Sequence, residues 1–337
     1  MTDQQVLDEE SQEGNSQKTL FVMTQTPRIL VTGAGGQIGL SLIPRLREMY
    51  GRDNIIATGR RRVDDLQNAG PYFYLDTSNY EEFAKLVVEN RVDWVIHFAS
   101  MLSAVGERNP SLALKTNIDG IHNALEVAKK YKLKIFLPST IGVFGPESPA
   151  VNTPDECVLK PTTIYGITKV HLELLCEYYH NKFGVDTRCL RYPGILSSDE
   201  PGGGTTDYAI EIFYEALKTG SYECFLEENQ ALPMMMMEDC LKCTIDVLLA
   251  PEESLKRRVY NIAAVSFTPK ELAEEIKKHM PDFSITYKPD FRQQIAASWP
   301  QSLDDSNARK DWGWAHQYGT KEIVEKMLND VRIKLKL

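Results

Sequence analysis

Apolar and polar positions follow two different spacings along most of this chain. Short apolar runs such as Ile29–Val31 are each followed by a segment in which apolar residues recur at intervals of three or four, as in residues 38–46. Short apolar runs are typical of buried strands, and the longer spacing predicts amphipathic helices. Strands that alternate with helices of this kind form right-handed βαβ units around a parallel sheet. The pattern therefore predicts a doubly wound α/β fold.

The alternation is regular up to about residue 196 and looser beyond Pro201. The segments expected as strands in the regular part are 29–31, 54–59, 72–78, 92–100, 133–140 and 186–196. The segments expected beyond it are helices at 207–220, 268–281 and 320–336 and a short strand at 221–226.

Composition and charge exclude several classes of protein. The 337 residues carry a formal net charge of -9 at pH 7, and the one short basic run is Arg60–Arg62. The chain therefore lacks the basic surface of a nucleic-acid-binding protein, and no stretch approaches the roughly 20 apolar residues of a membrane-spanning helix. The six cysteines suit a reducing compartment. Cys240 and Cys243 have the C-x-x-C spacing, but they lie in a predicted helix without a second pair, so we expect no metal site.

A glycine-rich turn follows the first predicted strand and opens the first predicted helix. Gly33, Gly36 and Gly39 have the spacing G-x-x-G-x-x-G. The first glycine permits a tight turn, the second lets the backbone approach a pyrophosphate, and the third lets helix and strand pack closely. Because a helix N-terminus also favours an anion, the turn predicts a Rossmann domain that binds a dinucleotide.

These features divide the chain into three parts. Residues 1–26 are polar, at first mostly acidic, and lack the pattern of a presequence, so we expect a disordered extension. Residues 27–195 are expected to form the Rossmann domain. Residues 196–337 are expected to form a smaller α/β substrate-binding lobe over the carboxyl edge of the sheet, where doubly wound folds bind their ligands.

The end of the second predicted strand leaves the choice of cofactor open. An acidic residue usually binds the ribose 2′-hydroxyl of NAD about 20 residues after the glycine turn, but Gly59 and Arg60 stand there. An arginine at this place either pairs with the 2′-phosphate of NADP or simply solvates a loop. Asp76 follows the next apolar run and either accepts a hydrogen bond from the adenine amino group or belongs to a turn that ends the strand.

A tyrosine and a lysine four residues apart form the candidate catalytic pair. Tyr165 and Lys169 share one face of a predicted helix. A tyrosine, with an ordinary pKa of roughly 10, acts as a base near pH 7 only if positive charge, here the lysine ammonium and an oxidised nicotinamide, stabilises its phenolate. Thr140 ends the preceding strand, where its hydroxyl would hold a substrate oxygen. Asn117 either kinks the intervening helix and holds a water near Lys169, or caps a shorter helix.

The order and spacing of these motifs resemble the extended short-chain dehydrogenase/reductase family. The resemblance covers residues 28 to about 335 and rests on the glycine turn and on the segments HFAS, TN, PSTIGVFG, YGITK and RYPG. Longer segments are similar to the branch of that family that oxidises L-threonine; they are HFASMLSAVGERNP, PSTIGVFGP, RYPGI, GGGTTDYA, LPMMMM and SWPQSLDDSNARKDWGW.

The resemblance implies NAD as oxidant and conversion of L-threonine, at its C3 hydroxyl, to 2-amino-3-oxobutanoate, which then decarboxylates or is cleaved to glycine by a ligase. It implies Tyr165 as the general base, Lys169 as the residue that binds the nicotinamide ribose, and Thr140 as the residue that orients the substrate hydroxyl. It also implies a homodimer and a mitochondrial location, with the cytoplasm as the alternative. The chain departs from the family pattern at Gly59, which lacks the usual acid, and at Met236, where relatives often have a tyrosine.

The residues expected to bind the cofactor lie at the ends of the predicted strands and on the catalytic helix. They are Gly33, Gly36, Gln37, Ile38, Gly39, Arg60, Leu75, Asp76, Phe98, Ala99, Tyr165, Lys169, Tyr192 and Ile195.

The segment PGGGTTDYA fits a zwitterionic substrate, whose ammonium and carboxylate both need partners. Asp207 is expected to attract the ammonium, and Thr205 and Thr206 are expected to bind the carboxylate, while the glycines let the segment close over the site. The remaining expected walls of the site are Ser103 and Trp299.

Two other functions share part of this pattern. A nucleotide-sugar epimerase or dehydratase has the same glycine turn and Tyr-Lys pair, but it needs basic side chains in the second lobe to bind a diphosphate. A non-catalytic dinucleotide sensor keeps the fold but has no need of Tyr165, Lys169 and Thr140 together. Turnover of L-threonine with NAD or NADP distinguishes the three functions.

Overall fold

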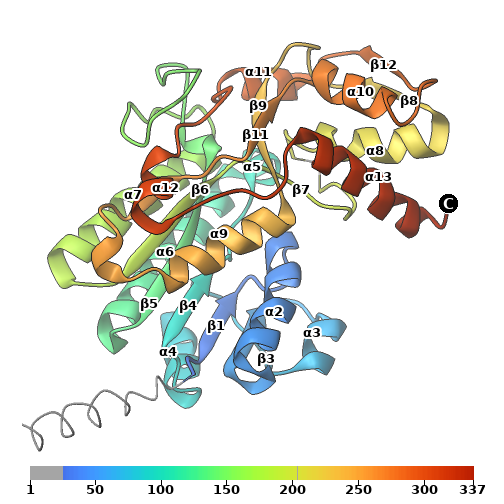
Figure 1. Ribbon diagram of the computed structural model, residues 1–337. Coiled ribbons are helices and arrows are strands. Elements are labelled where there is room, and N and C mark those ends of the chain that lie inside the picture. The colour runs from blue at the N-terminus through green and yellow to red at the C-terminus, as the bar shows by residue number, and fades with distance from the viewer. Residues whose placement is uncertain (1–25, 203) are drawn as a thin grey trace, which may run out of the picture.

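A parallel sheet of seven strands forms the centre of the computed structural model, which describes residues 26–202 and 204–337, without the side chains of 103–105 (Figure 1). In spatial order the strands are β10 (Val259–Asn261), β6 (Thr187–Tyr192), β5 (Lys134–Thr140), β4 (Trp94–His97), β1 (Ile29–Thr32), β2 (Ile55–Gly59) and β3 (Tyr72–Tyr74). All neighbouring pairs are parallel. The strand order reverses between β1 and β4, which is where doubly wound folds bind ligands. The sheet confirms the predicted doubly wound α/β fold.

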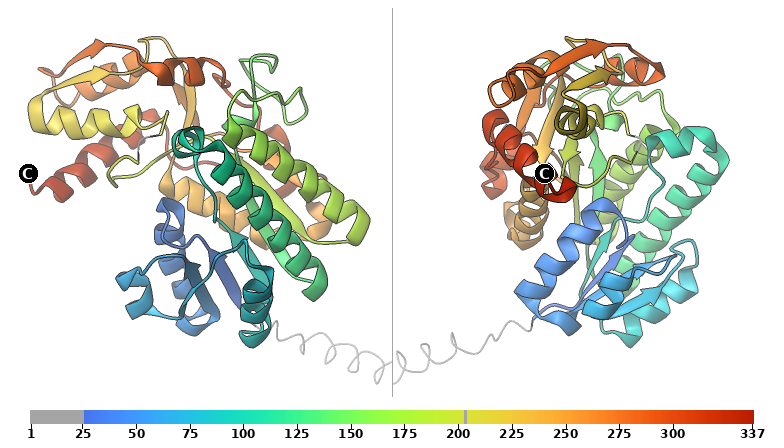
Figure 2. Two further views of the ribbon diagram at one scale, coloured as in Figure 1. Left: turned by 180° about the vertical axis from the view of Figure 1, so that it is seen from behind. Right: turned by 90° about the vertical axis from the view of Figure 1, so that its right-hand side faces the viewer.

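Helices cover both faces of the sheet because successive side chains of a strand point to opposite faces. In β1, Ile29 and Val31 belong to one buried cluster and Leu30 belongs to another. The helices of the first cluster are α2 (Gln37–Tyr50) and α9 (Met237–Leu249), and those of the second are α4 (Tyr80–Glu89), α6 (Pro110–Tyr131) and α7 (Ile164–Phe183). Figure 2 shows the resulting three layers from behind and from the side.

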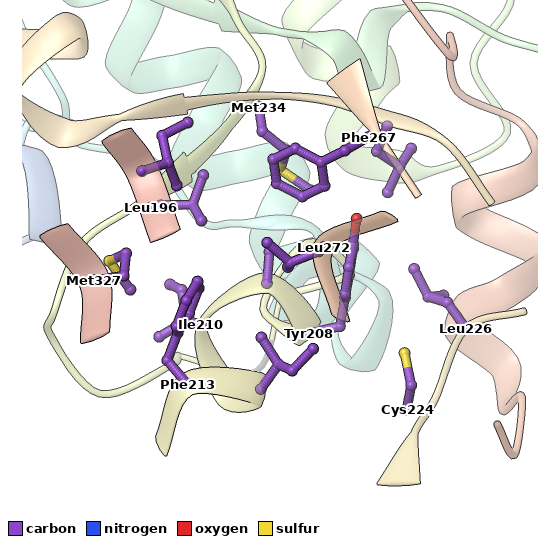
Figure 3. Packing of buried hydrophobic residues seen from close by; sticks show 14 of the residues in the cluster. Leu196, Tyr208, Ile210, Phe213, Cys224, Leu226, Met234, Phe267, Leu272 and Met327 are labelled. Atoms are coloured by element: carbon purple, nitrogen blue, oxygen red, sulfur yellow. The ribbon is translucent and has the colours of Figure 1, made fainter. Parts of the chain in front are cut away.

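A second, smaller group of elements lies over the carboxyl edge of the large sheet (Figure 1). It consists of α8 (Tyr208–Thr219), α10 (Pro269–Lys277) and α13 (Thr320–Leu335), a three-stranded sheet of β11 (Val265–Phe267), β9 (Leu232–Met236) and β7 (Gly194–Leu196), and a pair of strands, β12 (Ser284–Tyr287) and β8 (Ser221–Cys224). Figure 3 shows their common core, in which Phe213, Leu272 and Met327 come from the three helices. These elements confirm the helices and the strand predicted beyond residue 201.

The remaining elements are short. They are α3 (Asp64–Ala69), α5 (Ser103–Arg108), α11 (Phe291–Ala297), α12 (Ser306–Trp312) and the 3-10 turns η1 (Arg52–Asn54), η2 (Ile141–Val143) and η3 (Glu252–Ser254). Cys240 and Cys243 are buried in α9, as their helical context predicted. Across the described ranges, no helix is both long enough and apolar enough to span a bilayer.

One segment assigned to the second lobe returns to the large sheet. β10 pairs with β6 at its edge, and α9 packs against α2. The chain therefore crosses between the two groups more than once after residue 195. The division at residues 195 and 196 stays a prediction, and the extension predicted at 1–26 lies, except for Thr26, outside the described residues.

A buried ion pair joins helix α7 to strand β6. Arg191 donates from Nε and Nη2 to the two carboxylate oxygens of Glu173, at 2.8 and 2.9 Å. Ser139 donates to the same carboxylate, and the Nη1 of Arg191 donates to the carbonyl oxygen of Asp155 and to Asn261 Oδ1. The side chains of the pair are only 5% and 4% exposed, so each charge depends on these partners for its solvation.

The substitution Arg191→Met leaves the Glu173 carboxylate buried without its charged partner. We expect the free energy of unfolding to fall by about 3–5 kcal/mol, and the double variant Arg191→Met/Glu173→Met to recover part of this loss. The matched control Arg45→Met breaks an exposed pair with Glu48 and should cost less than about 1 kcal/mol. Urea unfolding followed by circular dichroism measures all three; equal losses in the Arg191→Met and Arg45→Met proteins would contradict the prediction.

Candidate active site

A cavity of about 640 Å³ lies at the carboxyl edge of the large sheet. Its walls come from the glycine turn after β1, the ends of β2, β4, β5 and β6, the first turns of α7 and the segment 202–207, of which residue 203 is not described. Each residue predicted to bind the cofactor lines this cavity. A second cavity, of about 560 Å³, lies at the amino ends of β4, β5 and β6 and contains none of the predicted site residues.

The glycine turn has the shape that a dinucleotide pyrophosphate requires. Gly33 has a φ of +64°, and a Cβ on it would lie 2.6 Å from the backbone nitrogen of Ala99. A Cβ on Gly39 would lie 2.5 Å from the carbonyl oxygen of Ala34, so both positions exclude a side chain. Gly36 is the N-cap of α2, and no side chain in the described part of the chain caps this helix. Its first N–H groups and its dipole therefore suit an anion.

Helix α7 brings Tyr165 and Lys169 to the cavity. Thr163 caps the helix by accepting a hydrogen bond from the backbone N–H of Gly166, at 3.0 Å. This cap fixes the first turn, which carries Tyr165. Lys169 lies one turn further along the same face, so the helical spacing seen in the sequence places both side chains in one site.

The strand end beside α7 completes the group of candidate catalytic residues. Lys169 donates from Nζ to the carbonyl oxygen of Pro138 at 2.7 Å, and this nitrogen lies 5.6 Å from the centre of the Tyr165 ring. Thr140 Oγ1 accepts a hydrogen bond from the backbone N–H of Gly142 at 3.1 Å, and its hydroxyl also bonds to Tyr165. The structure thus brings Tyr165, Lys169 and Thr140 together, as the sequence predicted.

Burial shifts the pKa of both candidate catalytic side chains away from the charged form. Desolvation raises the pKa of Tyr165 to about 12, and the hydrogen bond with Thr140 offsets only part of this. Desolvation lowers the pKa of Lys169 to about 8. No charged side chain is among the causes of the shift at Tyr165, so the stabilisation of its phenolate by Lys169 and an oxidised nicotinamide stays a prediction.

Asn117 connects two elements of the site instead of ending a helix. Helix α6 runs through it without interruption and is capped by Asn109, so the alternative of a cap at Asn117 is wrong. Its Nδ2 donates to Thr168 Oγ1 at 3.0 Å, and its Oδ1 accepts from the backbone N–H of Met101 at 2.7 Å. These bonds hold the segment after β4 against α7. The amide satisfies partners on other elements, so it does not compete with the backbone of α6.

The far end of the cavity carries Arg60, Leu75 and Asp76. Asp76 Oδ1 accepts hydrogen bonds from the backbone N–H and the hydroxyl of Ser78, at 3.0 and 2.8 Å. These bonds, more than the charge of Arg60, hold the pKa of Asp76 below its ordinary value. Asp76 therefore forms the turn that was one of its two interpretations, and its hydrogen bond to adenine stays a prediction.

The segment that opens the second group of elements forms the opposite wall. Asp207 is the N-cap of α8, and its Oδ2 accepts a hydrogen bond from the backbone N–H of Gly204 at 2.7 Å. A Cβ on Gly194 would lie 2.9 Å from Thr206 Cγ2, so the glycine of β7 makes room for the segment. Asp207 and Thr206 consequently face the same cavity as Tyr165.

Two further predicted substrate residues also line this wall. Thr205 is buried, and Trp299 packs on the core of the second group while it reaches the cavity. The side chain of Ser103 lies outside the described residues. The sequence reasoning missed other lining residues, whose only signal was that they adjoin recognised motifs; they include Ser100, Leu102, Thr116, Pro193 and Gly194.

Sequence reasoning also missed a buried histidine beside the glycine turn. His97 Nδ1 lies 3.0 Å from Thr32 Oγ1, which in turn accepts a hydrogen bond from the backbone N–H of Ala99. Burial lowers the pKa of His97 to about 3, so the ring is neutral and supports the turn through Thr32. Its place in the segment HFAS at the end of β4 was the available signal.

Comparison with known proteins agrees with this geometry. Residues 29–263 match the model of the NAD dependent epimerase/dehydratase family. The chain is 51% identical over 320 residues to a mitochondrial L-threonine 3-dehydrogenase of Bos taurus, an alignment that covers 94% of this chain and 86% of the relative.

Solved structures give the same result. The crystal structure of L-threonine dehydrogenase from Phytophthora infestans is 55% identical, with a TM-score of 0.88, over 92% of this chain and 100% of that one. A monomeric L-threonine 3-dehydrogenase from a metagenome, in its apo form, is 44% identical, with a TM-score of 0.86, over 90% and 99% of the two chains. The glycine turn, the Tyr-Lys pair and the match over residues 29–263 lead to one conclusion: the chain belongs to the NAD dependent epimerase/dehydratase family.

Proposed function

We propose that this chain catalyses the reaction of an L-threonine 3-dehydrogenase, the NAD-dependent oxidation of L-threonine at C3 to 2-amino-3-oxobutanoate. The observation that carries the proposal is that Tyr165, Lys169 and Thr140 line one cavity with the glycine turn and with Thr205–Asp207. The family is NAD dependent, and two relatives that bear the name of this activity are 51% and 55% identical.

The side chains divide the chemistry among them. Bound NAD would supply the hydride acceptor and, when oxidised, a positive charge. Tyr165 removes the proton of the C3 hydroxyl, and Thr140 orients that oxygen through its own hydroxyl. Lys169 spends one N–H donor on Pro138 and keeps two for the nicotinamide ribose. Asn117, fixed to Thr168 and Met101, is the proposed holder of a water that carries the proton away from Lys169.

Residues 204–207, the proposed substrate segment, carry the groups that an amino acid needs. The Asp207 carboxylate attracts the ammonium of threonine, while Thr205 and Thr206 offer hydroxyls and N–H groups to its carboxylate. Since Gly194 leaves no side chain beneath Thr206, the segment lies close to the catalytic group. Closure over the cavity would exclude water and align C3 with the cofactor.

The alternative functions fit the cavity less well. The described residues that line it from the second group are Gly194, Ile195, Gly202, Gly204, Thr205, Thr206, Asp207 and Trp299. None of these is basic, whereas a nucleotide-sugar epimerase or dehydratase needs cations for its diphosphate. A sensor without catalysis leaves the joint placement of Tyr165, Lys169 and Thr140 without a purpose.

We also propose a homodimer and a mitochondrial location. Helices α6 and α7 lie side by side on the surface (Figure 2, left), and Leu112, Ile167, Leu174 and Tyr178 on them are 46–64% exposed. An apolar face of this kind suits a symmetric interface. The location follows the bovine relative, whose name includes it. Light scattering tests the dimer, and a monomeric mass would reject it. Subcellular fractionation tests the location, and recovery of the protein in the cytoplasmic fraction would reject a mitochondrial location.

The first prediction concerns turnover. Purified protein mixed with L-threonine and NAD should show rising near-ultraviolet absorbance of the reduced nicotinamide. Tyr165→Phe should lower kcat by about 10²–10⁴-fold, because general-base catalysis contributes this much. Full activity in the Tyr165→Phe protein would reject the proposed base, and no rise with wild-type protein would reject the proposed function.

The second prediction concerns the cost of burying Lys169. Its folded pKa of about 8 lies below the ordinary value near 10.4, so the unfolded chain binds more protons between these values and stability rises with pH there. Lys169→Met should abolish turnover yet raise the free energy of unfolding at pH 7 by about 1–2 kcal/mol, after the lost bond to Pro138 is counted. This gain should shrink above pH 8.

Urea unfolding at pH 7 and at pH 10 measures this effect. The control Lys85→Met changes a side chain that is 70% exposed and should shift stability by no more than about 0.5 kcal/mol at either pH. A Lys169→Met protein that is less stable than wild type at pH 7 would show that burial of this lysine carries no such cost.

The third prediction concerns the substrate segment. Asp207→Asn keeps a side-chain oxygen that can accept the hydrogen bond from the backbone N–H of Gly204 but removes the negative charge proposed for the substrate ammonium. The KM for L-threonine should rise about tenfold or more, with the dissociation constant for NAD unchanged. The exposed Asp282→Asn is the charge-matched control. A KM unchanged in the Asp207→Asn protein would exclude this residue from substrate binding.

A further inference from the structure

The ribose end of the cofactor cavity excludes the acidic residue that NAD-binding folds usually place there. β2 ends at Gly59, and a Cβ on this glycine would lie 2.7 Å from the hydroxyl oxygen of Tyr72. That hydroxyl donates a hydrogen bond to the carbonyl oxygen of Arg61, so it is held in place. A side chain at position 59 would therefore have to displace the Tyr72 phenol, which lies on the neighbouring strand β3.

Two arginines follow Gly59 directly in the sequence. Arg60 and Arg61 both line the cavity and both are exposed. Within residues 26–202 and 204–337, neither guanidinium forms an ion pair or a side-chain hydrogen bond, whereas the adjacent Arg62 pairs with Asp64. The charges of Arg60 and Arg61 thus have no described role in holding the loop.

The basic loop lies against the glycine turn. A Cβ on Gly35 would lie 3.0 Å from Val63 Cγ2, which places the loop after Arg60 directly beside the turn that suits the pyrophosphate. The adenosine ribose joins the pyrophosphate to the adenine, so its 2′ position falls on this side of the cavity. The two guanidinium groups are consequently near the 2′ position and not at a remote surface.

The charge at this end is positive. Asp76 is the one carboxylate among the described residues that line it, and its oxygen is engaged by Ser78. One carboxylate against two guanidinium groups leaves net positive charge at the ribose. A 2′-hydroxyl offers nothing that this charge attracts strongly, whereas a 2′-phosphate accepts charge-assisted and bidentate hydrogen bonds from arginine.

We propose that Arg60 and Arg61 form a binding site for the 2′-phosphate of a dinucleotide, so that the chain binds NADP at least as tightly as NAD. The inference rests on the proposal that the cavity binds a dinucleotide, and it adds a site for one group of that ligand, the 2′-phosphate. It does not depend on threonine or on any catalytic residue. The other interpretation of the arginines, a solvated loop, predicts equal affinity for ligands with and without this phosphate.

The test compares two fragments that differ only in the 2′-phosphate. Calorimetric titration of the full chain, at an ionic strength near 0.15 M to limit non-specific attraction, measures the affinity for adenosine 2′,5′-bisphosphate and for adenosine 5′-monophosphate. We expect the bisphosphate to bind at least about tenfold more tightly than the monophosphate does. The double variant Arg60→Ala/Arg61→Ala should bring the ratio close to one, and the matched control Arg62→Ala, on the same loop but outside the cavity, should leave it unchanged.

A second variant asks whether the packing sets the preference. Tyr72→Phe removes the hydroxyl that meets the Cβ of residue 59, so Gly59→Asp/Tyr72→Phe should bind the bisphosphate less tightly than wild type does. Fluorescence titration with NADPH and NADH extends the comparison to whole cofactors. Equal affinity of wild type for the two fragments, undetectable binding of the bisphosphate, or a ratio that survives in the Arg60→Ala/Arg61→Ala protein would overturn the proposal. Because no titration contains threonine, each of these results leaves the proposed oxidation of threonine open.

Discussion

The position of helix α7 on the sheet is the constraint on which the active site depends. The buried pair of Glu173 and Arg191 ties the helix to β6, and Ser139, which precedes Thr140 on β5, donates to the same carboxylate. One carboxylate therefore sets the distance between a helix and two strands. Tyr165 and Lys169 lie on the helix, and Thr140 lies on the strand. These three side chains meet in the cavity only if the distance between helix and strand is kept.

The burial of the site also disfavours the charged forms of Tyr165 and Lys169. Desolvation moves the pKa of Tyr165 up and that of Lys169 down, so the chain alone holds the pair in neutral or poorly solvated forms. A positive cofactor is the remaining source of charge that stabilises a phenolate. The burial of Lys169 therefore costs stability, and groups with pKa values shifted in this way are typical of sites that serve chemistry.

Sequence reasoning reached the fold because the periodic signals were strong. The glycine spacing, the alternation of strands and helices, and the four-residue separation of Tyr165 and Lys169 each follow from local geometry. The return of β10 to the edge of β6 was missed because three residues carry no period. The partners of Asn117 were missed because Met101 and Thr168 lie 16 and 51 residues away, and only the folded chain brings them together.

The ribose end of the cavity illustrates a third kind of limit. The sequence shows that an acid is missing at Gly59, but it cannot show whether the space is empty or filled. The structure fills it with the Tyr72 hydroxyl, which comes from the neighbouring strand and bonds to the backbone of the basic loop. An empty space would have let a single substitution restore an acid, whereas a filled one makes glycine, tyrosine and arginine depend on one another. Under the proposed 2′-phosphate site, cofactor preference depends on the packing between β2 and β3 as well as on Arg60 and Arg61.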